Sequence, residues 1–351
     1  MSVKSLIVAS TREDAGKTST IIALARLLGK RFGYIKPLGD RFMYRKKRLW
    51  DYDASLLTQL FGLGEEPETI SIGFDHSKLR YMYDREAIFQ EYKRLLEQVG
   101  HGKDAVFVEC GRDLSYGASV CLDPLTISQH TDAPVLMLAG GTENEIADDL
   151  AFLQRFVTRD EANIAGVIVN KVVQMEDFCD IHLPEIEKLG VEVFGVIPHD
   201  PELSTISVST IADKLFAKVI AGEDSLHRRV QSILIGAMSV NAALMSRRAL
   251  EQDKLIITSG DRSDMVLAML ETKGTSGVVL TNDIVPPANI VAKAGELGVP
   301  LLQVATDTYA TALQIERIRP LLAAGDQGQI ERLTTLVSDA VDIGSIRQLL
   351  E

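Results

Sequence analysis

The sequence has few cysteines and no long apolar run, and each absence excludes a class of protein. Its three cysteines lack CxxC spacing and form an odd set, so neither a zinc site nor a disulfide framework is indicated; they are Cys110, Cys121 and Cys179. We expect them to be core thiols. No run of about 18 apolar residues occurs, and the apolar part of the first ten residues is too short for a signal peptide. We therefore expect no membrane segment and a cytoplasmic protein.

An excess of basic residues is also missing. Lysine and arginine number 37 against 49 aspartates and glutamates, which gives a formal net charge of −12. Proteins that bind nucleic acid depend on a positive surface that meets the phosphate backbone. The charge therefore argues against nucleic acid as a partner.

What is present is the composition of a folded chain of two domains. The 351 residues are 46% hydrophobic and 25% charged, values typical of soluble globular proteins. Apolar, β-branched runs alternate with amphipathic stretches, which predicts an α/β fold with a mostly parallel sheet. The runs are SLIVAS, FGYIKP, AVFVEC, APVLMLA, IAGVIVN and VEVFGVIP.

The strand–helix rhythm restarts after a polar segment, residues 222–225. We therefore predict a larger α/β domain over residues 1–222 and a smaller α/β domain over residues 223–351. In the smaller domain we expect strands at 232–238, 254–258, 277–281 and 300–304, and helices at 239–251, 263–272, 287–297 and 307–322.

The stretch ASTREDAGKTST, residues 9–20, has the setting of a phosphate-binding loop: an apolar strand precedes it and a helical pattern follows. Backbone N–H groups at a helix start point at an anion, and the helix dipole favours negative charge there. Lys17 would reach the β- and γ-phosphates and Thr18 would ligate Mg²⁺. Gly16 would allow close approach of the backbone. Thr11 stands where the generic motif has glycine.

Several spaced motifs resemble the dethiobiotin synthetase group of P-loop proteins, and more closely the version of that domain at the N-terminus of long phosphate acetyltransferases. In that group the loop opens with Gly-Thr, so Thr11 is expected and Ser10 replaces the glycine. The motifs span residues 1 to about 222; beyond the loop they are GYIKPLGD, DYDASLLTQLFGL, VFVEC, GVIVNKV and GVIPHDPEL.

The resemblance implies that ATP and Mg²⁺ are the cofactors. It implies Lys17 and Lys36 as catalytic lysines, and Thr18, Glu109 and Asp53, with Asp51 as the alternative, around Mg²⁺. Two lysines and a carboxylate-held cation suit phosphoryl transfer, which is catalysed mainly by positioning and by stabilising charge. The implied nucleotide-binding residues are Thr11, Arg12, Ala15, Gly16, Lys17, Thr18, Ser19 and Asn170, the last near the adenine.

Three features depart from the family pattern and leave alternatives open. Arg12 either crosses to a partner subunit or pairs with Glu13 or Asp14. Arg112 either approaches a phosphate or is an ordinary surface arginine. A basic segment either holds a second, anionic small molecule or is a solvated loop; its cations are Arg41, Arg45, Lys46, Lys47 and Arg48.

The segment LIITSGDRSDMVLAML, residues 255–270, resembles the signature of a small domain named for an Asp-Arg-Thr-Gly-Gly string, found next to the ATPase-like part of long phosphate acetyltransferases. Here Asp261, Arg262 and Ser263 keep only part of that string. Asp261 or Ser263 would cap the following helix, and Arg262 would contact a small ligand or a subunit. No catalytic pattern stands out, so we expect a regulatory or assembly domain. No counterpart of the acyl-transferring domain is identified, and acetyl transfer is not expected.

Three functions compete. The first is a slow, regulatory Mg-ATPase, and the second is an ATP-dependent ligase that activates a carboxylate-type small molecule. The third, a nucleotide-free scaffold, requires that the predicted site be vestigial. Relatives place their ATP sites near a subunit boundary, so the resemblance implies a homodimer or higher homo-oligomer.

Overall fold

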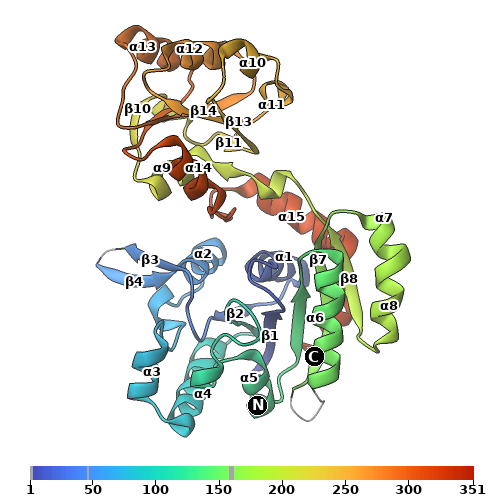
Figure 1. The fold of residues 1–351 in the computed structure, drawn as a ribbon. Helices are drawn as coiled ribbons and strands as arrows, with labels where there is room; N and C mark the ends of the chain where they lie inside the picture. The colour runs from blue at the N-terminus through green and yellow to red at the C-terminus, as the bar shows by residue number, and fades with distance from the viewer. Residues whose placement is uncertain (1–2, 46, 158–161) are drawn as a thin grey trace. The chain divides into compact units, whose positions relative to one another are not determined.

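The computed structural model describes residues 3–45, 47–157 and 162–351, and these residues form two compact units (Figure 1). The first unit comprises Met1–His199 together with Leu322–Glu351. The second comprises Asp200–Leu321. Each unit has its own sheet and its own core.

The first unit is built on a six-stranded sheet whose order is β2-β5-β1-β6-β7-β8. All five pairings are parallel. The central strands are buried on both faces, which explains why they read as continuous apolar runs. The strands are β1 Lys4–Ser10, β2 Phe32–Ile35, β5 Ala105–Glu109, β6 Val135–Ala139, β7 Ile164–Val172 and β8 Val193–Pro198.

Helices cover both faces of this sheet. The crossover from β1 to β2 runs opposite to all later crossovers, so α1 lies on one face and α4, α5, α6 and α8 on the other. A hairpin, β3 Phe42–Arg45 and β4 Arg48–Asp51, follows β2. The helices are α1 Lys17–Leu28, α2 Tyr52–Phe61, α3 His76–Met82, α4 Arg85–Gly100, α5 Pro124–Thr131, α6 Glu143–Phe156, α7 Met175–Asp177 and α8 Leu183–Lys188.

The end of the described chain returns to the first unit. Helix α15, Gln327–Ala340, packs along α1 and β8, and α16, Ile343–Gln348, follows it. Asp342 N donates to the Phe194 carbonyl at 2.7 Å. A Cβ on the neighbouring Gly195 would lie 2.2 Å from the Ala340 carbonyl oxygen, so this close approach requires glycine.

The second unit is a five-stranded sheet in the order β10-β15-β14-β13-β12, parallel except for β10. Consecutive strands advance in one direction, so α10 to α13 pack on one face while α9 and α14 pack on the other. A small ladder joins β9 Ile206–Ser207 to β11 Arg229–Val230. The remaining strands are β10 Lys218–Ala221, β12 Ser232–Ile235, β13 Lys254–Ser259, β14 Thr275–Thr281 and β15 Leu301–Gln303. The helices are α9 Val208–Leu215, α10 Val240–Leu244, α11 Arg247–Leu250, α12 Ser263–Glu271, α13 Ala288–Glu296 and α14 Thr308–Glu316.

The α/β architecture predicted from the sequence is confirmed, but the division of the chain differs from the predicted one at 222/223. Residues 200–222 group with the second unit, because α9 packs in its core and β10 pairs with β15. Residues 322–351 group with the first unit, because α15 packs along α1.

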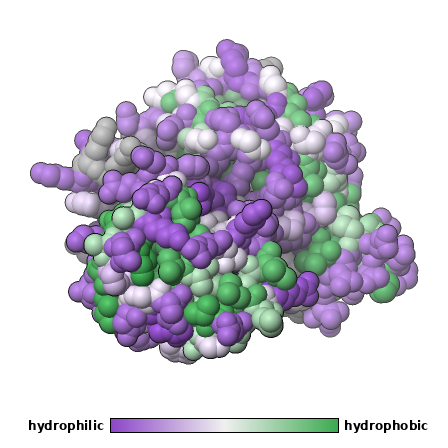
Figure 2. Space-filling view, turned by 90° about the horizontal axis from the view of Figure 1, so that it is seen from above, coloured by the Kyte–Doolittle hydropathy of each residue, from purple (hydrophilic) through white to green (hydrophobic). Residues whose placement is uncertain are grey.

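Two local expectations are also revised. The helix expected at 239–251 is two short helices, because Ser246 accepts from Ala249 N and starts a new one. Of the three cysteines expected in the core, Cys110 is buried while Cys121 and Cys179 are half-buried. Among the described residues, no helix combines the length and apolar character needed to cross a membrane. Hydrophilic side chains dominate the face drawn in Figure 2, with hydrophobic ones in small groups between them.

Candidate functional site

The loop between β1 and α1 wraps the start of the helix at the carboxyl edge of the sheet. Gly16 has φ of 99°, a left-handed value that favours glycine. A Cβ at this position would lie 2.3 Å from Nδ2 of Asn170. That amide donates to the Ala15 carbonyl at 2.8 Å, so the end of β7 supports the loop from below.

Lys17 and Thr18 are tied to the neighbouring strands. Lys17 is buried, and its Nζ donates to Ser10 Oγ at 2.7 Å and to the Arg112 carbonyl at 3.2 Å. Thr18 Oγ1 donates to Glu109 Oε1 at 2.8 Å. Both residues of the predicted motif therefore point toward the ends of β1 and β5.

Helix α1 starts without a side-chain cap. Across the described residues no side chain accepts from its first turn, and that turn contains no acidic residue. Its neighbours begin differently, since α2, α4 and α6 are capped by Asp51, Asp84 and Thr142. Uncapped N–H groups at a helix start attract an anion, because they add to the positive end of the helix dipole.

Lys36, at the end of β2, lies among four buried or nearly buried carboxylates. Its Nζ is 2.5 Å from Asp53 Oδ2 and 2.6 Å from Asp40 Oδ1. The Asp51 and Glu109 oxygens lie at 3.5 and 3.8 Å. Tyr34, which precedes it on β2, donates its hydroxyl to Glu109 Oε2 at 2.9 Å.

Burial and mutual charge shift the pKa values of these groups. Burial, opposed by Lys36 and reinforced by Asp53, raises the pKa of Glu109 to about 7. Burial lowers the pKa of Lys36, but the surrounding carboxylates, Asp53 first, outweigh it and hold that pKa well above its ordinary value. For Lys17 burial prevails and the pKa is lowered. Four carboxylates surround the single ammonium group of Lys36, so the acids of the cluster outnumber that cation.

The donor set fits a hard divalent cation. Oxygens of Asp40, Asp51 and Asp53 lie within 4.8 Å of one another, and carboxylate and hydroxyl oxygens are the ligands that Mg²⁺ prefers. Both Asp51 oxygens already accept backbone N–H groups, two at the start of α2 and two from Asp40 and Arg41. Among the described residues, no backbone N–H group is found to donate to the Asp53 carboxylate. Its oxygens are therefore better placed than those of Asp51 to ligate the cation. Bound there with Thr18 and Glu109, the ion would offset phosphate charge.

The other predicted residues lie around the same loop with different contacts. Arg12 pairs with α6, through Glu145 at 2.7 Å and Asp149 at 2.7 Å, rather than with Glu13 or Asp14. Thr11 N donates to the Leu138 carbonyl at 3.0 Å, and its hydroxyl is buried with no partner among the described residues. Ser19 is half-buried in the first turn of α1.

The basic segment at 41–48 makes contacts within the first unit. Arg41 lies 2.6 Å from Asp14 Oδ1 and 3.5 Å from Asp53 Oδ1. Arg48 pairs with Glu68, and Lys47 is exposed. The prediction for Lys46 falls outside the described residues.

Sequence reasoning missed Tyr34 and Asp40. Both lie in the quoted motif GYIKPLGD, at two residues before and four after Lys36. Because β2 carries Tyr34 into the core beneath the site, a tyrosine in a buried strand next to a functional lysine was the available signal.

In the second unit, Gly260 is required because a Cβ there would lie 1.7 Å from the Ile284 carbonyl oxygen. The predicted caps are not formed: within the described ranges no side chain caps α12, whose first turn instead contains Asp264. Arg262 pairs with that residue at 3.1 Å and donates to the Met238 carbonyl at 3.0 Å.

Comparison with known families covers most of the chain. A model described as an AAA domain matches residues 4–207, and one described as a DRTGG domain matches residues 210–318. The first match covers the phosphate loop and the cluster around Lys36. The second covers the unit that contains Arg262.

Curated relatives include two phosphate acetyltransferases. The protein from Pseudomonas putida is 28% identical over an alignment of 377 positions, which includes gaps and covers 99% of this chain and 52% of the relative. The protein from Synechocystis sp. is 27% identical over 358 residues, with 96% and 50% covered. The chain spans about half the length of the curated relatives it matches.

Solved structures resemble the chain only distantly. A ParA family ATPase from Chlorobium tepidum has a TM-score of 0.35 at 15% identity, covering 57% of this chain and 86% of its own. A structure of the CBS and DRTGG domains of a Clostridium perfringens pyrophosphatase, in complex with diadenosine tetraphosphate, has a TM-score of 0.28 at 15% identity. The match covers 48% of this chain and 84% of that structure's chain.

Proposed function

The chain belongs to the AAA-domain family, and on this premise we propose that it binds Mg-ATP at the loop ending in Gly16, Lys17 and Thr18 and hydrolyses it slowly. The observation that carries the proposal is the convergence of two lysines, a hydroxyl and an excess of carboxylates at the uncapped start of α1. The first turn would hold phosphates through backbone N–H groups. Lys17 and Lys36 would stabilise charge on the phosphoryl oxygens.

The role of hydrolysis is proposed to be regulatory. Within the ranges that the structure describes, the one group of acids close enough to hold a metal is Asp40, Asp51 and Asp53, in the first unit. The second unit contributes an arginine already paired with an aspartate of its own. The first unit thus contains the proposed nucleotide site, and the second has no such group of acids among its described residues. This combination suits a module that senses ATP, and the chain is similar to about half the length of phosphate acetyltransferases.

The test compares two buried lysines. Lys17→Ala should abolish the rise in melting temperature that ATP and Mg²⁺ produce. In the wild type, binding should raise the free energy of unfolding by about 2.7 kcal/mol at a hundredfold excess of ligand over Kd. Lys254→Ala is the control, since Lys254 is buried in the second unit and donates to the Glu251 and Lys273 carbonyls. Equal ATP-induced shifts in both variants would contradict the proposal.

An ATP-dependent ligase is the second candidate. Arg41 and Arg112 flank the loop, through Asp14 at 2.6 Å and Glu13 at 4.0 Å, and arginine forks suit a carboxylated or phosphorylated substrate. Phosphate release separates the two functions. A regulator should hydrolyse ATP slowly with or without metabolites, whereas a ligase should be strongly stimulated by one metabolite fraction.

We further propose a homodimer or higher homo-oligomer in the cytoplasm, as the family resemblance implies. Sedimentation with ATP present tests the assembly, and a monomeric value would reject it.

A further inference from the structure

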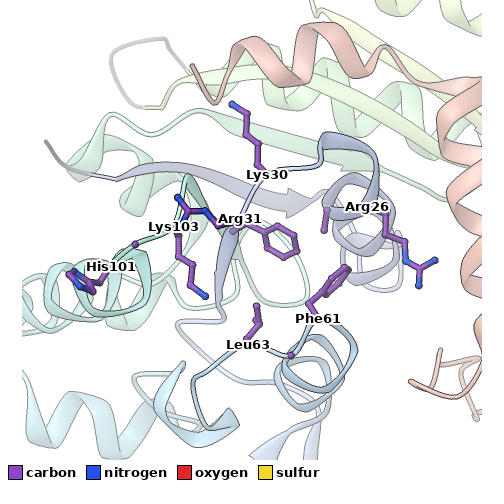
Figure 3. Close-up of a pocket in the computed structure, with 11 residues that line it drawn as sticks. Arg26, Lys30, Arg31, Phe61, Leu63, His101 and Lys103 are labelled. Atoms are coloured by element: carbon purple, nitrogen blue, oxygen red, sulfur yellow. The ribbon is translucent and has the colours of Figure 1, made fainter.

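A cavity of about 570 Å³ lies in the first unit, away from the phosphate loop. It is lined by the end of α1 and the turn after it, the end of α2, and the turn that follows α4 (Figure 3). These segments meet where the parallel strands begin, whereas the phosphate loop lies where they end. The volume is within the range of about 300–1,000 Å³ that small-molecule sites occupy.

The floor of the cavity is apolar and firmly packed. Phe32 contacts Phe61 edge to face with ring centroids 5.0 Å apart, and Phe107 in the same way at 5.4 Å. Leu63 is half-exposed. In Figure 3, Phe61, Leu63 and Lys103 lie around one opening. A ligand with an apolar body would bury surface against these groups.

The walls are cationic. None of the eleven lining residues is acidic, while Arg26, Lys30, Arg31 and Lys103 are basic and His101 lies beside them. One adjacent acid, Asp104, pairs with Arg31 at 3.1 Å. The lining residues are therefore basic in a chain whose net charge is −12.

Three of the four cations have no acidic partner among the described residues, whereas Arg31 is paired with Asp104. Arg26 donates to Gln327 Oε1 and Lys30 to the Leu350 carbonyl, each at 3.3 Å, and both acceptors are neutral. No ion pair of Lys103 is found within the described ranges. A multiply charged anion would therefore meet positive charge that the chain itself leaves uncompensated.

We infer that this cavity is a second binding site, for an organic phosphate with a flat apolar body. The body lies against Phe61 and Leu63, and the phosphate is held by Lys103, which lies near the pair that Arg31 forms with Asp104. A neutral aromatic molecule would leave the cations unused, and inorganic phosphate would leave the apolar floor in water. The inference is independent of the proposed ATP site.

The test uses 2-naphthyl phosphate, whose fluorescence reports binding to the full chain. The wild type should bind it more tightly than either inorganic phosphate or 2-naphthol, and more weakly as salt is raised. Equal binding of phosphate would reject the apolar contact, and equal binding of 2-naphthol would reject the charge contact.

Three variants locate the site. Lys103→Glu should weaken binding about fivefold or more, and Lys103→Gln should weaken it less. Lys93→Glu makes the same charge change at an exposed position of α4 outside the cavity, and should leave binding unchanged. The same affinity in Lys103→Glu and Lys93→Glu overturns the inference. So does loss of binding in Lys17→Ala, which would place the probe at the phosphate loop.

Discussion

Helices α1 and α12 each follow a parallel strand, but the first turn of α12 contains an acidic residue and the first turn of α1 does not. A glycine that a larger residue would crowd lies in each connection: Gly16 directly precedes α1, and Gly260 directly follows β13. The second residue of α1 is Thr18, and the first turn contains no acid. The second residue of α12 is Asp264, which is held by Arg262.

The difference shows how one local architecture can either hold an anion or dispense with one. A carboxylate in the first turn compensates the positive end of the helix dipole from within the chain. Without it, the N–H groups and Lys17 are left for an external anion. The comparison therefore separates the unit proposed to bind nucleotide from the unit proposed to regulate.

The largest effect on ATP affinity should come from exchanging the second residues of the two helices. Thr18→Asp adds an acid to the first turn of α1 beside Glu109, and should weaken ATP binding about a thousandfold, or about 4 kcal/mol. Calorimetric titration with Mg-ATP measures the change.

Asp264→Thr is the reciprocal change, and it should leave ATP affinity as it is in the wild type. If Thr18→Asp still bound ATP normally, the first turn of α1 would not be the anion site.

A smaller effect should appear in the pH dependence of the free energy of unfolding. We expect it from Glu109 in the first unit, which accepts a hydrogen bond from Thr18 of α1. Between the usual pKa of 4.5 and the folded value of about 7, the folded protein keeps on Glu109 a proton that the unfolded chain releases. The free energy of unfolding should thus fall as pH rises through this window, by up to about 3 kcal/mol from this group. Glu109→Gln removes the titration.

The measurement is denaturant unfolding of both proteins from pH 4.5 to 8 without magnesium. The wild type should lose stability relative to Glu109→Gln as pH rises. Parallel curves would show that Glu109 titrates alike in the folded and unfolded chains.

The smallest effects concern the two arginines that lie near these helix starts. Arg12 and Arg262 are each paired with acids of their own unit at partly exposed positions. Arg12→Ala and Arg262→Ala should both change ATP affinity less than about threefold, because such exposed pairs contribute little. A large loss of hydrolysis in Arg12→Ala with unchanged affinity would instead support an arginine that acts on a partner subunit's nucleotide.

Much of the first unit could be predicted because its buried strands are continuous apolar runs with polar residues at their ends. Lys36 directly follows β2 and Glu109 ends β5, and strands that end at one edge of a sheet bring such residues together. The roles of these residues stay predictions. Thr142 and Glu145 form a capping box at the start of α6, and the spacing of the two residues is a local signature that the sequence displays.

Other features could not be predicted, some of them because they depend on the exact path of the backbone. Asp40 lies only four residues after Lys36, but the motif did not show that the backbone between them brings the two side chains together. Residues 239–251 are partly helical, as their pattern predicted. The Ser246 hydroxyl, however, donates to the Ala243 carbonyl and accepts from Ala249 N, and one helix ends and another begins at this point. Nothing local in α15 marked it as a neighbour of α1.

The return of α15 to the first unit has a consequence for biosynthesis. On a ribosome adding about 5–20 residues per second, the roughly 300 residues that separate α1 from α15 require about 15–60 seconds. During that interval the surface of α1 that α15 later covers is open to chaperones or to other chains. The inserted second unit, whose residues emerge before α15, can fold while its host is still incomplete.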